Sequence, residues 1–457
     1  MKRLAAATLL LAVCLIAGCS AMPQDVLPSM AGAAATPEQT ADAAVSEAGT
    51  EAQDNGEVID YAAEAKMGGS ETAKQEVTVA AYVDGDTVHF SVPESVDPSG
   101  VLKARFIGVD TPESTGKIEE YGKKAAGFTK ERLSDARSIV IESDNGSWNL
   151  DSTGGRSLVW VWYKPQDAGG YRNLNIELLQ QGLAVPYSSS NNRLGSVCMA
   201  AIAQARRDKL NIYSGEKDPD FYYGDAVELT LKELRLNIAD YEGVKVAFEG
   251  VITINGGNSV FVEQYDEETG LCYGMSVYYG YGMSGAGLDI LSVGNLSRIV
   301  GTVQYYEAGD RYQVSGLSYR QMKPDAPDNI KKIASGYEPR YAEITAADFA
   351  GAAVKLDGEN GAQELELSEL LMDTTVSMKA LKVKSVYIED NGKATLSCES
   401  SGAEVSVRVE ALTNADGEPV ITKALKGKRI DVKGVVDSHN GFKQVHVFLP
   451  EGVAVKK

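Results

Sequence analysis

The feature that most constrains this chain is a switch between two apolar periodicities within residues 77–215. Runs in which apolar and polar residues alternate have the period of a β-strand, whereas apolar residues at every third or fourth position have that of a helix. Strand-like runs cover 76–92, 101–110, 138–143 and 157–163, and helix-like runs cover 119–137, 173–184 and 196–211. This order predicts an α+β domain, namely a five-stranded β-barrel with three helices packed on it.

The residues before this domain have a different composition. The N-terminus, "MKRLAAATLLLAVCLIAGCS", combines a basic start, a short apolar run and small residues before Cys19, which is the pattern of an export signal. "LIAGC" resembles the bacterial lipobox, which implies a signal peptide over 1–18, cleavage before Cys19 and lipidation of its thiol. Residues 19–76 have almost no aromatic residues, which predicts an acidic flexible tether. We therefore expect an extracytoplasmic protein that is lipid-anchored to the bacterial cell membrane.

The C-terminal half consists mainly of strand-like runs separated by glycine-containing turns, and its sequence repeats. The pattern E-L-x-L-x-E-L occurs at 228–234 and again at 364–370. Two copies of one β-module are therefore expected, at 225–325 and 341–457. Their short strands resemble those of the OB-fold, a five-stranded barrel, so both modules are predicted to be mainly-β OB-like barrels.

The charge is unevenly distributed. The net charge of −20 excludes a generally basic nucleic-acid coat protein. Residues 20–76 sum to −9 and residues 216–457 to −12, whereas residues 77–215 sum to −1 and are nearly neutral. The five cysteines include no CxxC pair, so neither a disulfide framework nor a zinc site is expected. Only three histidines occur, which leaves little for histidine-based catalysis.

The most informative motif is "VDGDTVHF", in which Asp84 and Asp86 flank a glycine before a strand. By itself it can be a solvated hairpin turn, because Asp-Gly is a common turn signal, or it can be a cation site. Downstream, "RFIGVDTPE" runs from Arg105 to Glu113, and "DSTGGRSLVWVW" places Arg156 at the start of a strand. The last helix then runs into "KLNIYSG".

Taken in this order, the four motifs resemble the pattern of the thermonuclease (staphylococcal nuclease-like) family over residues 77–215. That pattern is DGDT, then R-x-x-x-x-D-T-P-E, then G-R-x-L, then K-x-N-[IL]-[WY]. The resemblance implies a Ca²⁺ cofactor, a nucleic-acid substrate and hydrolysis of phosphodiester bonds.

The resemblance also implies the ligands of the cation, which are Asp86, Asp110 and the carbonyl of Thr111. The chemistry agrees, because Ca²⁺ takes oxygen ligands from carboxylates and backbone carbonyls. Asp84 is then expected to belong to the turn or to the surroundings of the ligands. Glu113 fits a general base that positions and deprotonates a water molecule.

Arg105 and Arg156 fit the complementary half of such a site. A guanidinium can bind two phosphate oxygens, and it binds them more tightly as charge develops in the transition state. The expected catalytic residues are therefore Arg105, Glu113 and Arg156. Tyr187, in "VPYSSS", is the one tyrosine left for substrate contact where the family has a pair. The loop from Asp151 to Arg156 is one residue longer than the D-K-Y-G-R of the family and lacks its lysine.

We therefore expect an endonuclease that acts on DNA and also on RNA, and the family resemblance implies that water attacks phosphorus and leaves 3′-phosphate ends. One alternative is a non-catalytic nucleic-acid-binding lipoprotein that uses this fold as a scaffold. The joint presence of Arg105, Glu113 and Arg156 argues against it. In the other alternative the C-terminal modules dock to a cell-surface partner. Residues 225–325 carry 14 acidic and 7 basic residues, which favours a structural or docking role over nucleic-acid binding there.

Overall fold

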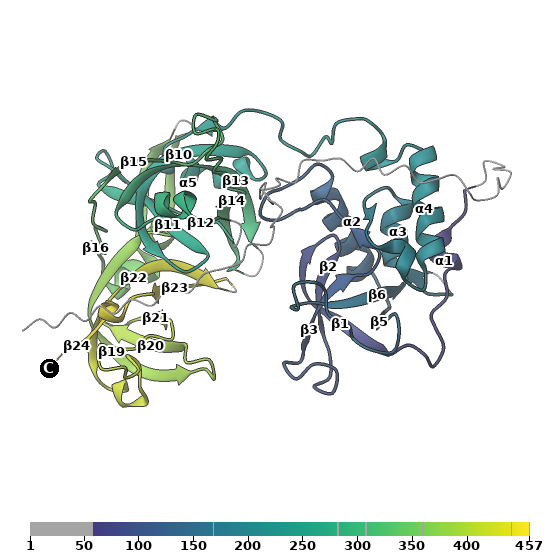
Figure 1. Cartoon of the computed structure of the whole chain (residues 1–457). Helices are drawn as coiled ribbons and strands as arrows, with labels where there is room; N and C mark the ends of the chain where they lie inside the picture. Colours follow the sequence, from purple (N-terminus) through teal and green to yellow (C-terminus); the bar gives the residue numbers. More distant parts are fainter. Residues whose placement is uncertain are drawn as a thin grey trace, which may run out of the picture. The chain divides into compact units, whose positions relative to one another are not determined.

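The structure is a computed structural model that describes residues 58–167, 169–280, 283–306, 309–358, 361–439 and 441–456. The predicted signal peptide, Cys19 and most of the predicted tether lie outside the described residues. From Val58 onward the chain forms one compact unit, which contains three closed β-sheets (Figure 1). No helix within the described ranges is both long enough and apolar enough to cross a membrane.

The first sheet is the five-stranded barrel expected from the sequence. Its strands are β1 (Lys74–Asp84), β2 (Thr87–Ser91), β3 (Val101–Phe106), β5 (Ser138–Glu142) and β6 (Ser157–Lys164). Strand β1 pairs with β5 through its first residues and with β2 through the rest, and β3 pairs in parallel with β6. These pairings close the ring. The short strands β4 (Val109–Asp110), β7 (Arg172–Asn173) and β8 (Val185–Pro186) lie outside it, where β4 pairs with β8 and β7 with β6.

The three predicted helices are present in this domain, each shorter than its apolar run. They are α2 (Gly122–Ser134), α3 (Leu174–Gln180) and α4 (Gly195–Arg207), followed by the 3₁₀ turn η2 (Asn211–Tyr213). Asn173 caps α3, because its side chain accepts a hydrogen bond from the backbone N–H of Ile176. Every residue of α3 is buried. This part of the fold therefore confirms the α+β prediction.

The folded domain begins earlier than residue 77. Helix α1 (Tyr61–Glu64) lies within the stretch that the sequence assigned to the tether. The carboxylate of Asp60 binds Arg172 (Nη1–Oδ2 2.6 Å), and the backbone of Ile59 exchanges two hydrogen bonds of 3.0 Å with the side chain of Gln204. The buried Glu142 accepts a hydrogen bond from the backbone N–H of Gly68. Polar contacts hold residues 58–76 on the domain. Because such contacts need no regular spacing of apolar residues, the sequence of this segment shows no apolar periodicity.

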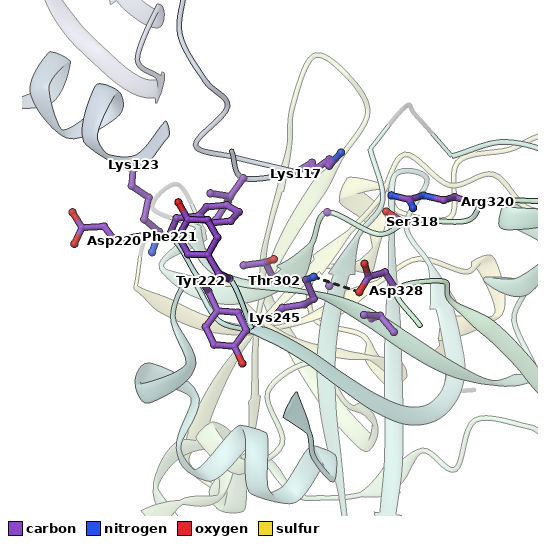
Figure 2. Close-up of a pocket in the computed structure, with 16 residues that line it drawn as sticks. Lys117, Lys123, Asp220, Phe221, Tyr222, Lys245, Thr302, Ser318, Arg320 and Asp328 are labelled. Atoms are coloured by element: carbon purple, nitrogen blue, oxygen red, sulfur yellow. Dashed lines mark hydrogen bonds and ion pairs between the residues drawn. The ribbon is translucent and has the colours of Figure 1, made fainter. Parts of the chain in front are cut away.

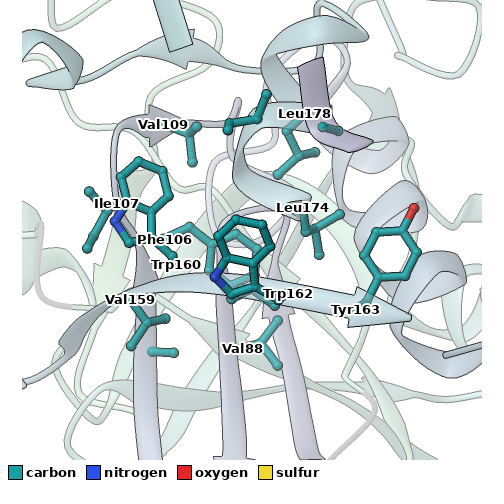
Figure 3. Packing of buried hydrophobic residues seen from close by; sticks show 14 of the residues in the cluster. Val88, Phe106, Ile107, Val109, Val159, Trp160, Trp162, Tyr163, Leu174 and Leu178 are labelled. Carbon is teal, nitrogen blue, oxygen red and sulfur yellow. The ribbon is translucent and has the colours of Figure 1, made fainter. Parts of the chain in front are cut away.

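The core of the first domain explains why β6 does not alternate in sequence. Trp160 and Trp162 are both fully buried (Figure 3), and so are Val159 before them and Val161 between them. One face of the strand points into the barrel, and the residues of β6 share a core cluster with Leu174, Ile176 and Leu178 of α3. Val161 N–H also donates to Asn175 of α3 at 2.9 Å. Both faces of β6 are therefore shielded from solvent, which is why its sequence is a continuous apolar run.

Two further sheets follow and close in the same way. The second ring consists of β10 (Lys245–Asn255), β11 (Ser259–Asp266), β12 (Leu271–Tyr278), β13 (Asn295–Tyr306) and β14 (Arg311–Ser315). The third consists of β19 (Thr375–Ile388), β20 (Ala394–Ser400), β21 (Ala403–Val409), β22 (Arg429–His439) and β23 (Phe442–Val447). In each ring the first strand pairs with the second and the fourth, and the third pairs in parallel with the fifth. The prediction of two mainly-β modules is confirmed.

Short elements flank these rings. The flanking strands are β9 (Val227–Glu228), β15 (Lys331–Ser335), β16 (Ala342–Glu343), β17 (Ala353–Gly358), β18 (Gly361–Glu366) and β24 (Val453–Val455). The helices are α5 (Leu231–Leu236), α6 (Ala286–Ile290), α7 (Ala346–Gly351) and α8 (Leu367–Leu370). Both copies of E-L-x-L-x-E-L form the end of a short strand followed by a helix, α5 or α8. Leu356 and Leu370 pack into the core of the second ring, so residues from the predicted second module complete the first.

Candidate active site

The two carboxylates of the DGD motif stand on a buried turn between β1 and β2. Gly85 makes this turn possible, because a Cβ atom at that position would lie 2.8 Å from Thr111 Oγ1 and 3.0 Å from Ala125 Cβ. The turn is thereby pressed against Thr111 and helix α2. Asp86 is 1% exposed and Asp84 is 7% exposed, so neither carboxylate belongs to a solvated hairpin turn.

Arg105 connects the two carboxylates that the sequence assigned to a cation. Its Nη1 donates to Asp86 Oδ1 at 2.6 Å, and its Nη2 forms a short hydrogen bond with Asp110 Oδ1. The backbone N–H of Thr111 donates to Asp86 Oδ2 at 3.0 Å. Burial raises the pKa of Asp86 to about 6, against the opposing effect of the Arg105 charge. The structure thus brings Asp86, Asp110, Thr111 and Arg105 together.

The oxygen atoms at this point suit a hard cation. Thr111 Oγ1 is buried and has no hydrogen-bond partner among the residues that the structure describes, which is costly unless a ligand satisfies it. Among the described residues, no three His, Cys, Asp or Glu side chains converge in a way that could hold a metal ion. A cation here would therefore depend on two carboxylates, the oxygens of Thr111 and water. That donor set suits Ca²⁺ and does not suit a transition metal.

Glu113 lies on the loop that leaves this cluster. Its backbone carbonyl accepts a hydrogen bond from Glu119 N–H at 2.8 Å. Partial burial of the carboxyl group, together with a hydrogen bond and repulsion from Asp84, raises the pKa of Glu113 to about 8. Asp84 also accepts hydrogen bonds from the backbone N–H of Ser114 (3.1 Å) and from its hydroxyl (2.8 Å). Asp84 therefore holds the Glu113 loop, a role that the sequence did not indicate.

Arg156 lies beside the strand that carries Arg105. Strand β3 pairs in parallel with β6, with Ala104 opposite Ser157, so Arg156 directly precedes the paired residue. Its Nε donates to Asp151 Oδ2 at 2.7 Å, and its carbonyl accepts from Asp151 N–H at 2.8 Å. Asp151 and Arg156, the two ends of the longer loop, are thus hydrogen-bonded to each other. The sequence analysis did not predict this role of Asp151.

Tyr187 is placed near the same edge. Its backbone N–H donates to the carbonyl of Gly108 at 3.1 Å, and β8 just before it pairs with β4, with Val185 opposite Asp110. The side chain of Tyr187 is 61% exposed, so it is accessible to a ligand.

Comparison with known proteins agrees with this arrangement. Residues 103–215 match the sequence profile of the family described as staphylococcal nuclease homologue. A thermonuclease of Staphylococcus intermedius is 29% identical over 153 residues, which cover 32% of this chain and 82% of that protein. A thermonuclease of Staphylococcus hyicus is 32% identical over 150 residues, which cover 32% of this chain and 79% of that protein.

A protein of different length is also similar. The endonuclease YhcR of Bacillus subtilis (strain 168) is 34% identical over 161 residues, which cover 33% of this chain and 12% of that protein. The matched family region contains Arg105, Asp110, Glu113 and Arg156. Through its first folded domain, the chain belongs to the family of staphylococcal nuclease homologues.

Proposed function

We propose that this protein is a Ca²⁺-dependent endonuclease that hydrolyses phosphodiester bonds of DNA and also of RNA. The observation that carries the proposal is the cluster in which Arg105 binds both Asp86 and Asp110, beside the loop of Glu113. This cluster lies in a domain whose relatives are named thermonucleases and an endonuclease. Asp86, Asp110 and the oxygens of Thr111 would hold the cation.

The side chains of this chain divide the chemistry between them. A bound Ca²⁺ would supply positive charge to a phosphate oxygen. Glu113 would accept a proton from the attacking water, and Arg105 and Arg156 would donate hydrogen bonds to the non-bridging oxygens. Loss of the 5′-oxygen then leaves a 3′-phosphate end. Tyr187 would contact the substrate from the exposed edge beside β4.

Purified protein incubated with single-stranded DNA, duplex DNA and RNA tests this function. We expect cleavage with Ca²⁺ and none in excess EDTA. Glu113→Gln should lower kcat by about 10²–10³ while retaining oligonucleotide binding, because a positioned proton acceptor is lost and the phosphate-binding arginines remain. Asp86→Ala should weaken Ca²⁺ binding measured by calorimetry. Glu131→Gln, an equal charge change on an exposed residue of α2, is the control and should leave kcat unchanged.

Two results would refute this function. Full activity in EDTA would remove the cation from the reaction. Binding of DNA without any cleavage in Ca²⁺ would instead support the non-catalytic nucleic-acid-binding alternative.

We also propose that the protein is extracytoplasmic and anchored to the bacterial membrane through lipid on Cys19. The support is the sequence around Cys19, a short apolar run that follows two basic residues and ends in small residues. Docking of the C-terminal modules to a cell-surface partner stays a prediction.

A further inference from the structure

The loop after Glu113 contacts the second β-ring through its backbone. The carbonyl of Gly116 accepts hydrogen bonds from Gln304 Nε2 at 2.9 Å and from Ser315 Oγ at 3.1 Å. Gly316 permits the approach, because a Cβ atom there would lie 2.9 Å from the same carbonyl oxygen. The residues that follow Gly116 are therefore held against strands β13 and β14.

A pocket of about 260 Å³ opens beside this contact (Figure 2). Four segments line it, namely residues 117–123 after the Glu113 loop, residues 220–223, strands of the second ring around Lys245 and Thr302, and residues 316–328 after β14. Only the first of these segments belongs to the family region 103–215. The pocket is thus built largely from residues outside the matched family region.

The pocket is positively charged in a protein whose net charge is −20. Its charged lining residues are Lys117, Lys123, Lys245, Arg320, Asp220 and Asp328. Lys245 lies 3.3 Å from Asp328 (Nζ to Oδ1), which neutralises that pair. Within the part of the chain that the structure describes, Lys117, Lys123 and Arg320 form no ion pair with a carboxylate. Their charges are available to an anionic ligand.

Aromatic rings stand beside these charges. Phe221 and Tyr223 meet edge to face, with ring centroids 4.8 Å apart. The hydroxyl of Tyr222 donates to the carbonyl of Asp225 at 2.9 Å, which restrains its ring. Figure 2 shows Phe221 and Tyr222 close to Lys123, between the two sides of the pocket. Rings beside lysines and an arginine suit nucleobases that stack while phosphates bind the cations.

We propose that this pocket binds single-stranded nucleic acid, as an extension of the strand held at the active site. Backbone phosphates would lie against Lys117, Lys123 and Arg320, and bases would stack on Phe221 and Tyr222. The lining of the pocket begins at Lys117, four residues after Glu113 along the chain. The link to catalysis rests on the proposed nuclease function, whereas the binding itself can be measured without cleavage.

The test measures binding of labelled single strands of about 4 and about 20 nucleotides to the full chain in EDTA, by fluorescence anisotropy. Lys123→Gln/Arg320→Gln should bind the long strand about tenfold more weakly and the short strand as the wild type does. Because two phosphate contacts are lost, the slope of log K against log salt should become less negative by about 1.4. Tyr222→Ala should weaken binding of the long strand at least about fivefold without changing that slope.

Lys331→Gln/Lys332→Gln is the matched control, since it removes two exposed charges from β15. It should leave affinity for both strands unchanged. An equal loss of affinity in the control would overturn the proposal in favour of bulk charge, and wild-type affinity in Lys123→Gln/Arg320→Gln would exclude the pocket. Displacement of the probe by a mononucleotide, with no advantage for the long strand, would identify a nucleotide pocket and also overturn it.

These outcomes are separable from the nuclease function. A wild type that never cleaves DNA in Ca²⁺ refutes the proposed activity, yet the difference between the two strand lengths in EDTA still decides whether the pocket binds.

Discussion

At the residue scale, Asp151 decides where the Arg156 guanidinium points. The ion pair uses Nε of Arg156, which leaves both terminal amino groups for a phosphate. Against burial, which would raise it, hydrogen bonds from Thr153 and Arg156 lower the pKa of Asp151 to about 2. The carboxylate is therefore ionised at any working pH. Asp151 acts on the reaction as a positioning residue, through Arg156.

We expect Asp151→Ala to reduce kcat about tenfold. Without the ion pair to Asp151, the Arg156 guanidinium is no longer held in one orientation and donates fewer hydrogen bonds in the transition state. Arg156→Ala should reduce it by about 10²–10³. The decisive measurement is the double variant Asp151→Ala/Arg156→Ala, which should be no slower than Arg156→Ala alone. If the double variant has a kcat about tenfold below that of Arg156→Ala, then Asp151 has a separate role and the positioning argument is wrong.

At the element scale, the N-terminus of α2 is pressed against the backbone of Glu113. A Cβ atom at Gly122 would lie 2.1 Å from the carbonyl oxygen of Glu113, and that oxygen belongs to backbone that cannot rotate away. The helix begins after Tyr121, whose N–H donates to the buried Asp218 at 2.6 Å. We therefore expect a change at the start of α2 to displace the Glu113 loop.

Gly122→Ala should displace the Glu113 loop and lower kcat by tenfold or more, on the order expected for a shift of about 1 Å in a catalytic group. The same helix supplies the control. A Cβ atom at Gly127 would meet no other part of the protein within 4 Å, so Gly127→Ala should keep kcat and raise stability by up to about 1 kcal/mol. Measurement of kcat and of urea unfolding for both variants decides the matter. Equal activities would show that the loop tolerates displacement.

At the scale of the whole molecule, a buried ionic network joins the second and third rings. Arg311 of β14 forms a short hydrogen bond with Asp437 of β22, and Asp437 Oδ2 lies 2.9 Å from Nδ1 of His446. Nε2 of His446 lies 2.9 Å from Glu410. Further groups contact this network. Lys393 forms an ion pair with Glu410, Asp373 forms one with Arg311, and the ring of Phe448 packs against that of His446.

The pH dependence of this network follows from its pKa shifts. Burial alone would lower the pKa of His446, but hydrogen bonds with Asp437 and Glu410 raise it above its usual value. The hydrogen bond with His446 lowers the pKa of Glu410 to about 2. The histidine contribution is complete below about pH 6.5 and is lost as pH rises through the folded pKa. The Glu410 contribution is complete above about pH 4.5 and is lost as pH falls toward 2.

His446→Gln should therefore lower the melting temperature by about 3 °C or more near pH 6, and by less near pH 9, because the charge contribution is lost as pH rises through the folded pKa of the imidazole. Calorimetric melting curves at both pH values measure this difference. His439→Gln, at an exposed position of β22, should change neither curve. A deficit of His446→Gln that is equal at both pH values would mean that packing, and not charge, makes the contribution.

Much of the first domain could be predicted from local sequence. The helices and strands of residues 77–215 were predicted because their apolar periodicity is a property of neighbouring residues. The cluster of Asp86, Arg105 and Asp110 was predicted from motifs, and the structure brings these side chains together. The burial of the DGD turn was not evident, because it depends on Thr111 and Ala125 filling the space beside Gly85.

The sequence by itself determined the fold class and the three β-rings, and it predicted Asp86, Arg105 and Asp110 as site residues, since each of these is written in short-range patterns. Only the tertiary structure decided that residues 58–76 pack on the domain, that Leu356 completes the core of the second ring, and that Asp151 directs Arg156. It also decided that the loop after Glu113 meets Gln304 and Ser315. The physical reason is common to these cases: single polar contacts and isolated apolar side chains between distant segments stabilise the fold without leaving any periodic pattern along the chain.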